Sequence, residues 1–492
     1  MKTLFIIVFS ALILLGGCAA KSAIHSAVAE GDLKAVANYA DKGGDLEALP
    51  PKNWVSGFYK LDGNRPLHEA AARGSLEMAA LLITRGANLE SRNANGETPL
   101  LTSARFGRFE MYDLLLQKGA DRHATDKDGN TGLHLALEAL HKEPAKAEEA
   151  VRFFLARSAK IDAQNRWGNT PVHLAAKHDL IGVVKLLEQK GALLDVPNRY
   201  GETPLFLTLR MGHFGHPDQV NLTSAVFEYL LTKKLNFAAV DHKGETLLHH
   251  TCNPDYIAAL GARGADINHA DKDGQTAVFK ALADCPLPSV QAYAKLGFDP
   301  KALGAKGKNV GKTALAVAMN NPYSNEAIVP FLIDYGADVL QTDDLGLSAI
   351  HAAATRSRRM IELILSKGAD INARAHSDAT PLHVASSILT SKGQEETEGY
   401  AALLEQPGIL IDARDKKGCT PLHRAVNAGG VERVRLLLQK GADTTAQEMR
   451  GHTPIDLAIL QKNEAVLALL KAHHAPTHIN PKPGYAVLCT YP

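Results

Sequence analysis

The stretch of the chain with the most obvious chemical potential is GAKGKNVGKTALAVA, residues 304–318, where glycines and lysines run into an apolar segment. A loop that binds nucleotide phosphates needs glycine, four spacer residues and then Gly-Lys-Ser/Thr, because that length points successive backbone N–H groups at the phosphates. Here the position five residues before Gly311 is Lys306, and Gly307 stands one residue too close. The preceding KLGFDPKAL also lacks the apolar, β-branched run of a buried strand. Both observations argue against a nucleotide site.

The chain has 21 histidines and two Asp-Lys-Asp-Gly segments, so the sequence has to be examined for metal-binding sites as well. Eight of them stand at the fourth position of one recurring motif, namely His25, His68, His134, His173, His249, His351, His383 and His423. His473, His474 and His478 lack the cysteine or carboxylate spacing that completes a metal site. The Asp-Lys-Asp-Gly openings at Asp126 and Asp271 lack the downstream ligands of a calcium loop. Without an HExxH or GxSxG motif either, the sequence predicts no metal, no cofactor and no enzymatic activity.

The Gly-x-Thr step of the first stretch recurs along the whole chain, and this repetition points to architecture instead of chemistry. The unit RPLHEAAARGSLEMAALLITRGANLESRNANGETPLL begins at Arg65. Near copies begin at Thr98, Thr131, Thr170, Thr203, Thr246, Thr276, Thr313, Ser348, Thr380, Thr420 and Thr453. The commonest step is 33 residues, and the others run from 30 to 43. A degraded copy, SAIHSAVAEGDLKAV, starts at Ser22 and makes thirteen units.

These units resemble the ankyrin repeat, whose period is about 33 residues and whose opening motif is Thr-Pro-Leu-His-x-Ala. The best matches are TPLHVA from Thr380, TPLHRA from Thr420 and TPVHLA from Thr170. The resemblance covers residues 22–474. It implies an all-α repeat solenoid of about thirteen helix-turn-helix units with β-hairpin fingers, and it gives the motif histidines a role in hydrogen bonding between repeats.

One unit shows why such a sequence folds in this way. From Asp415, Asp-Lys-Lys-Gly predicts a tight turn, and Thr420 can then cap a helix in whose first turn Pro421 needs no N–H partner. Gly429-Gly430 ends that helix, and a second helix with several leucines closes at Gly441. Neither helix can bury its apolar face alone, so neighbouring units must stack.

The first residues, MKTLFIIVFSALILLGGCAAKS, predict the compartment. One lysine precedes an apolar run from Leu4 to Leu15, which is too short to span a bilayer and is typical of a secretory signal. Leu-Gly-Gly-Cys18 resembles a bacterial lipobox, which implies that residues 1–17 are removed and that Cys18 carries the lipid. By the same resemblance Ala19 favours the outer membrane, facing the periplasm. An ordinary signal peptide cut elsewhere is the alternative.

Charge is balanced once the leader is removed. The whole chain has 54 basic and 53 acidic residues, and the leader contains one lysine and no acid, which leaves a net charge of zero. No polybasic stretch would follow a phosphate backbone, so nucleic acid is not an expected partner.

Four cysteines remain besides Cys18, and an oxidising periplasm permits them to pair. Cys252 and Cys285 both stand just before a proline-bearing turn in consecutive units. Equivalent positions in stacked units lie about 10 Å apart, beyond the roughly 7 Å between Cα atoms that a bridge allows. The unit from Thr246 is three residues short and could be displaced. A disulfide between Cys252 and Cys285 therefore stays an open possibility.

Residues that bind a partner are expected on the concave face and the fingertips. Two successive tips, NRWGNTP and NRYGETP, place Trp167 and Tyr200 where other copies carry aspartate, asparagine or lysine, with Arg166 and Arg199 beside them. Trp, Tyr and Arg dominate the energetics of protein interfaces. These four residues are predicted to bind a partner, although the two aromatic rings could also pack on one another.

Insertions also point to the fingers, since insertions in repeats map to loops that often lie on the binding face. The first junction contains PPKNWVSGFYKLDGN, which puts Trp54, Phe58 and Tyr59 in an extended finger. The glycine- and lysine-rich stretch that begins at residue 304 belongs to a lengthened basic finger with Lys301, Lys306, Lys308 and Lys312. This finger could bind an acidic partner, or it could be a solvated loop.

The expected organisation is a signal peptide at 1–17, a degenerate first repeat with a long finger at 18–62, ankyrin-type repeats at 63–474 and a proline-rich tail at 475–492 that could cap the last repeat. The expected function is non-catalytic binding of another protein at the bacterial envelope. One form is an inhibitor or immunity protein that occludes a periplasmic enzyme. The alternatives are a structural adaptor or assembly factor of the outer membrane and, less favoured by the lipobox, a secreted host-directed effector.

Overall fold

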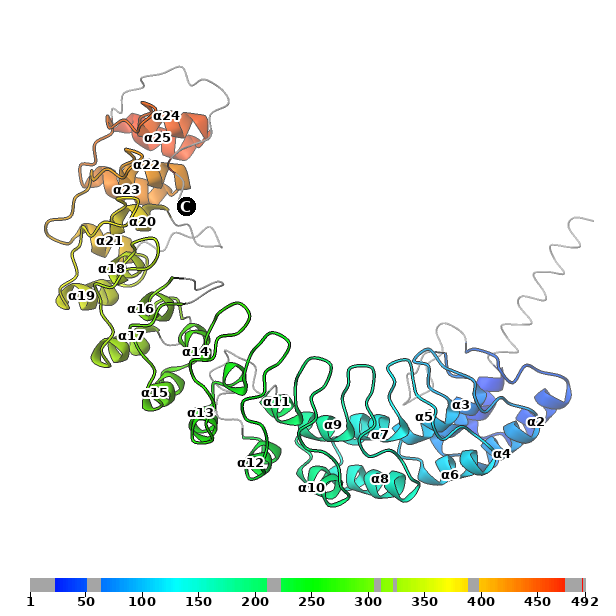
Figure 1. Cartoon of the computed structure of the whole chain (residues 1–492). Coiled ribbons are helices and arrows are strands. Elements are labelled where there is room, and N and C mark those ends of the chain that lie inside the picture. The colour runs from blue at the N-terminus through cyan, green and yellow to red at the C-terminus, as the bar shows by residue number, and fades with distance from the viewer. Residues whose placement is uncertain are drawn as a thin grey trace, which may run out of the picture. The chain divides into compact units, whose positions relative to one another are not determined.

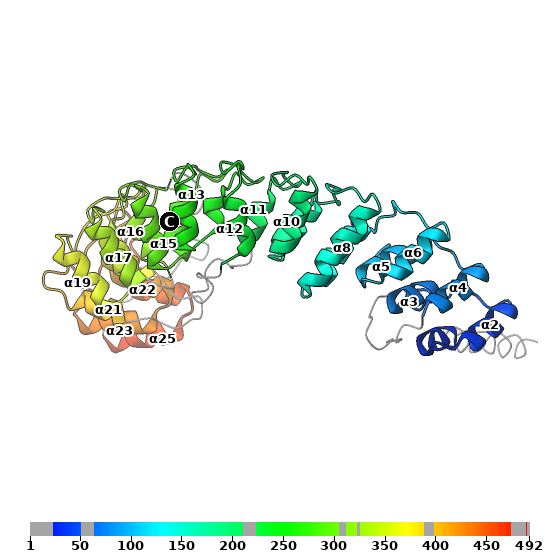
Figure 2. The ribbon, with the colours of Figure 1, turned by 90° about the horizontal axis from the view of Figure 1, so that it is seen from below.

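The computed structural model describes residues 23–50, 63–209, 223–304, 311–321, 325–387, 398–473 and 489. The described residues form two compact units, which divide after His242. Within each unit, helices pair and the pairs stack side by side in two layers (Figures 1 and 2). The predicted signal peptide at 1–17 and nearly all of the predicted tail lie outside the described residues.

In the first unit, residues 23–30 are helical and precede α2. Its helices are α2 (Leu33–Asp41), α3 (Pro66–Arg73), α4 (Leu76–Thr84), α5 (Pro99–Arg105), α6 (Phe109–Gln117), α7 (Gly132–Leu140), α8 (Pro144–Ala156), α9 (Pro171–Lys177), α10 (Ile181–Gln189), α11 (Pro204–Leu209) and α12 (Ala225–Leu231). The first helices of successive repeats contact one another from α3 through α11, and α4 contacts α6 in the second layer.

In the second unit, the first element is a four-residue 3₁₀ helix, η2 (Leu247–His250). The helices that follow are α13 (Pro254–Gly261), α14 (Ala277–Asp284), α15 (Leu287–Lys295), α16 (Ala314–Ala318), α17 (Asn325–Asp334), α18 (Ala349–Ala353), α19 (Arg358–Ser366), α20 (Pro381–Ser387), α21 (Glu398–Leu404), α22 (Pro421–Ala428), α23 (Val431–Gln439), α24 (Pro454–Leu460) and α25 (Glu464–Ala472). The described residues therefore form thirteen pairs, and the predicted all-α repeat solenoid is confirmed.

Local chemistry sets the bounds of these helices as the sequence predicts. Thr98 accepts a hydrogen bond from the N–H of Leu101 at the start of α5, with proline in the first turn. Gly429 adopts a φ of 77° and ends α22. The fingers are tight turns more than regular hairpins, since their described residues pair only as isolated bridges, Ala270 with Thr276 and Leu303 with Thr313.

Each of the eight motif histidines joins its own repeat to the next one through hydrogen bonds, and this prediction is confirmed. In His173, Nδ1 accepts a hydrogen bond from the N–H of Thr170 at 3.1 Å, and Nε2 donates to the carbonyl of Glu202 in the following finger at 3.1 Å. All eight histidines reach a carbonyl further along the chain at 2.9 to 3.2 Å. Burial lowers the pKa of His68, His173 and His383 to about 4, so each stays neutral and keeps both bonds.

Cys252 and Cys285 are joined by a disulfide with 5.5 Å between their Cα atoms. This distance is well below the simple stacking distance of about 10 Å between helices. The repeat that contains Cys252 is a short one, and its first element is the four-residue 3₁₀ helix η2. The hydroxyl of Tyr293, on α15, donates to the carbonyl of Leu248 at 2.9 Å and ties the two repeats together.

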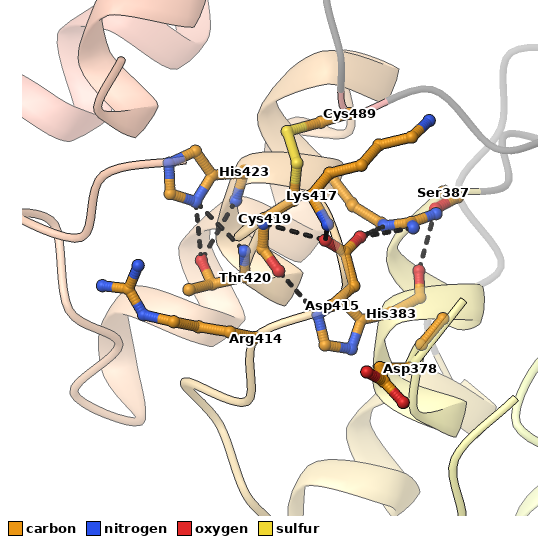
Figure 3. A network of polar contacts seen from close by, with 12 residues as sticks. Asp378, His383, Ser387, Arg414, Asp415, Lys417, Cys419, Thr420, His423 and Cys489 are labelled. Carbon is orange, nitrogen blue, oxygen red and sulfur yellow. Dashed lines mark hydrogen bonds and ion pairs between the residues drawn. A yellow bond between two sulfur atoms is a disulfide. The ribbon is translucent and has the colours of Figure 1, made fainter. Parts of the chain in front are cut away.

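A second disulfide, Cys419–Cys489, is not among the sequence predictions (Figure 3). It joins the finger before α22 to the tail segment, and the side-chain amide of Asn427 donates to the carbonyl of Cys489 at 3.1 Å. Cys489 is the one described residue of the tail, and it contacts the repeat that begins at Thr420. The predicted capping of the last repeat concerns residues that lie outside the described ones.

Candidate partner-binding groove

A groove of about 910 Å³ runs along the first unit. Residues of four successive fingers line one wall, and residues of α5, α7, α9 and α11 line the other. Trp167, Tyr200 and Arg166 stand on the finger wall, so three of the residues predicted to bind a partner share one surface.

Each of these fingertips is held by an asparagine at its base. Asn165 Oδ1 accepts hydrogen bonds from the N–H groups of Trp167 at 3.1 Å and Asn169 at 3.0 Å. Asn198 repeats the arrangement with Tyr200 at 2.8 Å, and its Nδ2 donates to the side chain of Asn169 at 2.9 Å. The fingers therefore present their aromatic residues on a turn whose polar groups are satisfied.

Neighbouring fingertips are also bonded to one another through the backbone. The N–H of Arg166 donates to the carbonyl of Asp128 at 2.7 Å, and the N–H of Arg199 donates to that of Trp167 at 2.8 Å. In the next finger, the N–H of His242 donates to the carbonyl of Tyr200 at 2.7 Å. This line of bonds fixes the spacing between the aromatic side chains, which reduces the ordering required when a partner binds.

The two aromatic rings have separate contacts. Tyr200 is 50% exposed, and its ring meets the edge of the His242 ring at 6.4 Å. The guanidinium of Arg166 lies over the Trp167 ring at 5.4 Å and pairs with Asp128 at 3.0 Å. Because each ring has its own contacting residue, the described contacts favour display over packing of the two rings on one another.

A charged cluster forms the helix wall of the groove. Glu138 on α7 accepts from Lys177 Nζ at 2.8 Å and from His178 Nε2 at 3.0 Å. These hydrogen bonds, that of His178 first, lower the pKa of Glu138 to about 2. His178 in turn stacks on His141, with 4.3 Å between ring centroids. Arg105 pairs with the buried Glu97 at 2.5 Å.

Sequence reasoning missed this helix wall. Arg105, Glu138 and Lys177 each stand seven residues after the threonine that opens their repeat. A charged residue recurs at that position in three successive repeats, and all three line the groove. Alignment of the repeats could have revealed this recurrence.

The profile of the family described as "Ankyrin repeats (3 copies)" matches residues 67–147, 144–222, 293–375, 323–407 and 400–482, which together make up more than half of the chain. The chain belongs to the ankyrin-repeat family. It is accordingly a scaffold for protein–protein interaction, and ankyrin repeats are generally non-catalytic.

Several curated ankyrin-repeat proteins are similar to it. Alpha-latrocrustotoxin-Lt1a of Latrodectus tredecimguttatus is 26% identical over 350 residues, which is 68% of this chain and 23% of that protein. The human neurogenic locus notch homolog protein 2 is 27% identical over 40% of this chain and 7% of its own length. The mouse B-cell lymphoma 3 protein homolog is 26% identical over 50% of this chain and 54% of its own length. The chain thus spans at most about half the length of these relatives.

The other predicted residues of this ankyrin protein are more scattered. Arg199 is exposed at its fingertip but does not line the groove. Cys252 and Cys285 belong to the second unit, as do Lys301 and Lys312. Cys18, Trp54, Phe58, Tyr59, Lys306 and Lys308 lie outside the described residues. Among the helices that the structure describes, none is both long and apolar enough to cross a membrane.

Proposed function

We propose that this ankyrin-repeat protein binds a partner protein through the groove of its first unit, with Trp167 and Tyr200 as the anchoring side chains. The supporting observation is the presentation of two aromatic residues, one of them half exposed, on fingertips that hydrogen bonds hold in place. Aromatic side chains on a preorganised surface contribute much binding energy for little lost conformational entropy.

The charges along the groove indicate what the partner presents. The carboxylates of Asp128, Glu138 and Glu202 are already engaged, by Arg166, by Lys177 with His178, and by Asn198. Lys127 and Arg199 are exposed on the same fingers and have no ion-pair partner among the described residues. The free charges are therefore cationic, and the surface favours an acidic segment with an apolar residue that can contact Trp167.

We place this binding at the bacterial envelope, with the chain held by lipid on Cys18. The lipobox-like Leu-Gly-Gly-Cys18 supports the location. Within this class, occlusion of a periplasmic enzyme by an inhibitor or immunity protein suits a groove with preorganised aromatic side chains. An adaptor or assembly factor of the outer membrane is the alternative, and the identity of the partner decides between them.

Crosslinking followed by affinity capture from the native envelope tests the groove. The chain with both Trp167→Ala and Tyr200→Ala is compared with the unchanged chain, after circular dichroism shows the same helix content. Leu345→Ala is the matched control, because Leu345 occupies the same finger position in the second unit and is 49% exposed. We expect the double variant to lose the partner at least about tenfold and the control to keep it. Equal capture by all three would place the interface elsewhere.

The location has its own test. Cys18→Ser removes the thiol that the lipid would modify, so we expect the chain to move from the membrane pellet to the soluble fraction and to lose incorporation of a labelled fatty acid. Fractionation with the membrane and continued labelling of the variant would contradict the anchor while leaving the groove untouched.

A further inference from the structure

A second cavity, of about 290 Å³, lies in the first unit apart from the groove. It opens between the loop at 121–125, which follows α6, and the loop at 158–164, which follows α8. It shares no lining residue with the groove. Its volume is about twice the roughly 150 Å³ of an engineered protein cavity that accommodates benzene, so a small organic molecule fits.

The floor of this cavity is apolar and depends on one unusual residue. Tyr112 and Phe154 meet edge to face with 5.1 Å between centroids, and Leu133 lies beside them. Gly132 stands where most repeats carry the proline of the Thr-Pro-Leu-His motif. A Cβ on Gly132 would come within 2.9 Å of the Phe154 ring, so glycine lets that ring approach the backbone.

One polar group in the floor is left without a bond. Tyr112 is 5% exposed, and its hydroxyl has no hydrogen-bond partner among the described residues. Burial raises the pKa of Tyr112 to about 12, despite the opposing effect of the Arg122 and Arg157 charges, so the hydroxyl keeps its proton at ordinary pH. The hydroxyl oxygen is not among the fully buried polar atoms, so solvent reaches it, and an acceptor on a molecule bound in the cavity can take its hydrogen bond.

The rim of the cavity is cationic. Arg122 and Lys160 are exposed and have no ion-pair partner in the part of the chain that the structure describes. Arg157 also lines the cavity, but it is already engaged by Asp113 through two bonds of 2.6 and 2.5 Å and lies over the Phe153 ring at 3.5 Å. No carboxylate is among the residues that line the cavity.

We propose that this cavity binds a small amphipathic carboxylate, with its apolar body on Phe154 and Leu133 and its carboxylate between Arg122 and Lys160. The same carboxylate also accepts a hydrogen bond from the Tyr112 hydroxyl. An aromatic ring with a short acidic chain has the required size and polarity. The cavity and the groove share no lining residue, so the small molecule and the partner protein would occupy separate sites.

Isothermal titration of the full chain with 3-phenylpropionate, and with its neutral amide as the matched ligand, tests the proposal. We expect the acid to bind and the amide to bind at least about tenfold more weakly, because the amide loses the charge-assisted bonds. Arg122→Gln with Lys160→Gln should weaken the acid about tenfold. Tyr112→Phe should weaken it about fivefold. Lys190→Gln, which changes an exposed cation of the first unit that lines neither the cavity nor the groove, should leave the affinity unchanged.

Two results would overturn the proposal. The first is equal affinity for the acid and the amide, or affinity for the acid that survives the Arg122/Lys160 change. The second is the absence of heat with benzoate, 3-phenylpropionate and 4-phenylbutyrate alike, up to their solubility. Thermal melts of each variant show whether the chain is folded, and Tyr112→Phe keeps the ring that the neighbouring phenylalanines contact.

Discussion

The ion pair between Arg424 and Asp415 offers the sharpest test of how this stack is held together. Both side chains are almost completely buried, at 2% and 1% exposure, and Arg424 donates to Asp415 Oδ2 from Nη2 at 2.5 Å and from Nε at 3.1 Å. The other oxygen of Asp415 accepts from the backbone N–H groups of Lys417 and Cys419 at 2.8 and 2.9 Å (Figure 3). One carboxylate thus holds both the finger turn and a buried cation.

Asp415→Asn separates the hydrogen bonds of the turn from the ion pair with Arg424. Asn165 and Asn198 show that asparagine holds an equivalent turn, so the two backbone bonds should survive. The buried guanidinium, however, loses its countercharge, which costs roughly 3–5 kcal/mol. Arg424→Leu gives the residue found at the same motif position as Leu135 and Leu174, but it leaves the buried Asp415 carboxylate with only its two backbone donors, so it should also cost roughly 3–5 kcal/mol.

The double variant Asp415→Asn/Arg424→Leu has neither charge and matches the pattern of the other repeats, so we expect it to be within about 1 kcal/mol of the unchanged chain. The coupling between the two sites is then about 3 kcal/mol or more. Because repeats contact only their neighbours and can unfold separately, the assay is hydrogen exchange of peptides from α22 and α23 under oxidising conditions. Unchanged protection in Asp415→Asn, or a double variant less protected than either single change, would refute the reasoning.

Three further predictions concern the motif histidines and the two disulfides. The folded pKa values of His68, His173 and His383, at about 4, lie below the ordinary 6.5, so the unfolded chain binds more protons between these values and stability falls as the pH drops from 7. Each should contribute a loss of about 2 kcal/mol by pH 5, and melting temperatures that are equal at pH 7 and pH 5 would contradict this. The two disulfides close loops of 33 and 70 residues, so removing either by paired Cys→Ser changes should destabilise its repeats by about 3–4 kcal/mol in denaturant titrations. Mass spectrometry of thiols alkylated without reductant should find all four cysteines protected, and free thiols at these positions would contradict the pairing.

Much of the fold followed from the repeated sequence. The threonine caps, the glycine ends and the paired bonds of the motif histidines all act within one repeat or between adjacent ones, so a period and a motif are enough to predict them. Trp167 and Tyr200 stood out for the same reason, because the other repeats show what a fingertip ordinarily carries.

What escaped prediction depends on departures from the average repeat. Cys252 and Cys285 lie closer together than a simple stacking distance between helices predicts, and only coordinates show that their Cα atoms are 5.5 Å apart. The partner of Cys419 lies 70 residues away in a tail without the repeat pattern. The cavity at Tyr112 is lined by residues of two successive repeats, including Gly132 and Phe154 of α8, and no single repeat reveals that combination.

The bond between Cys419 and Cys489 also changes how the last described repeats come apart. A stack of this kind loses its outermost units first, since each of them is held from one side only. Here α22 through α25 all lie inside the covalent loop. When these helices detach they remain tethered at both ends, so their return is an intramolecular search over a short span. A protease that cuts once within the loop releases no fragment until the disulfide is also reduced.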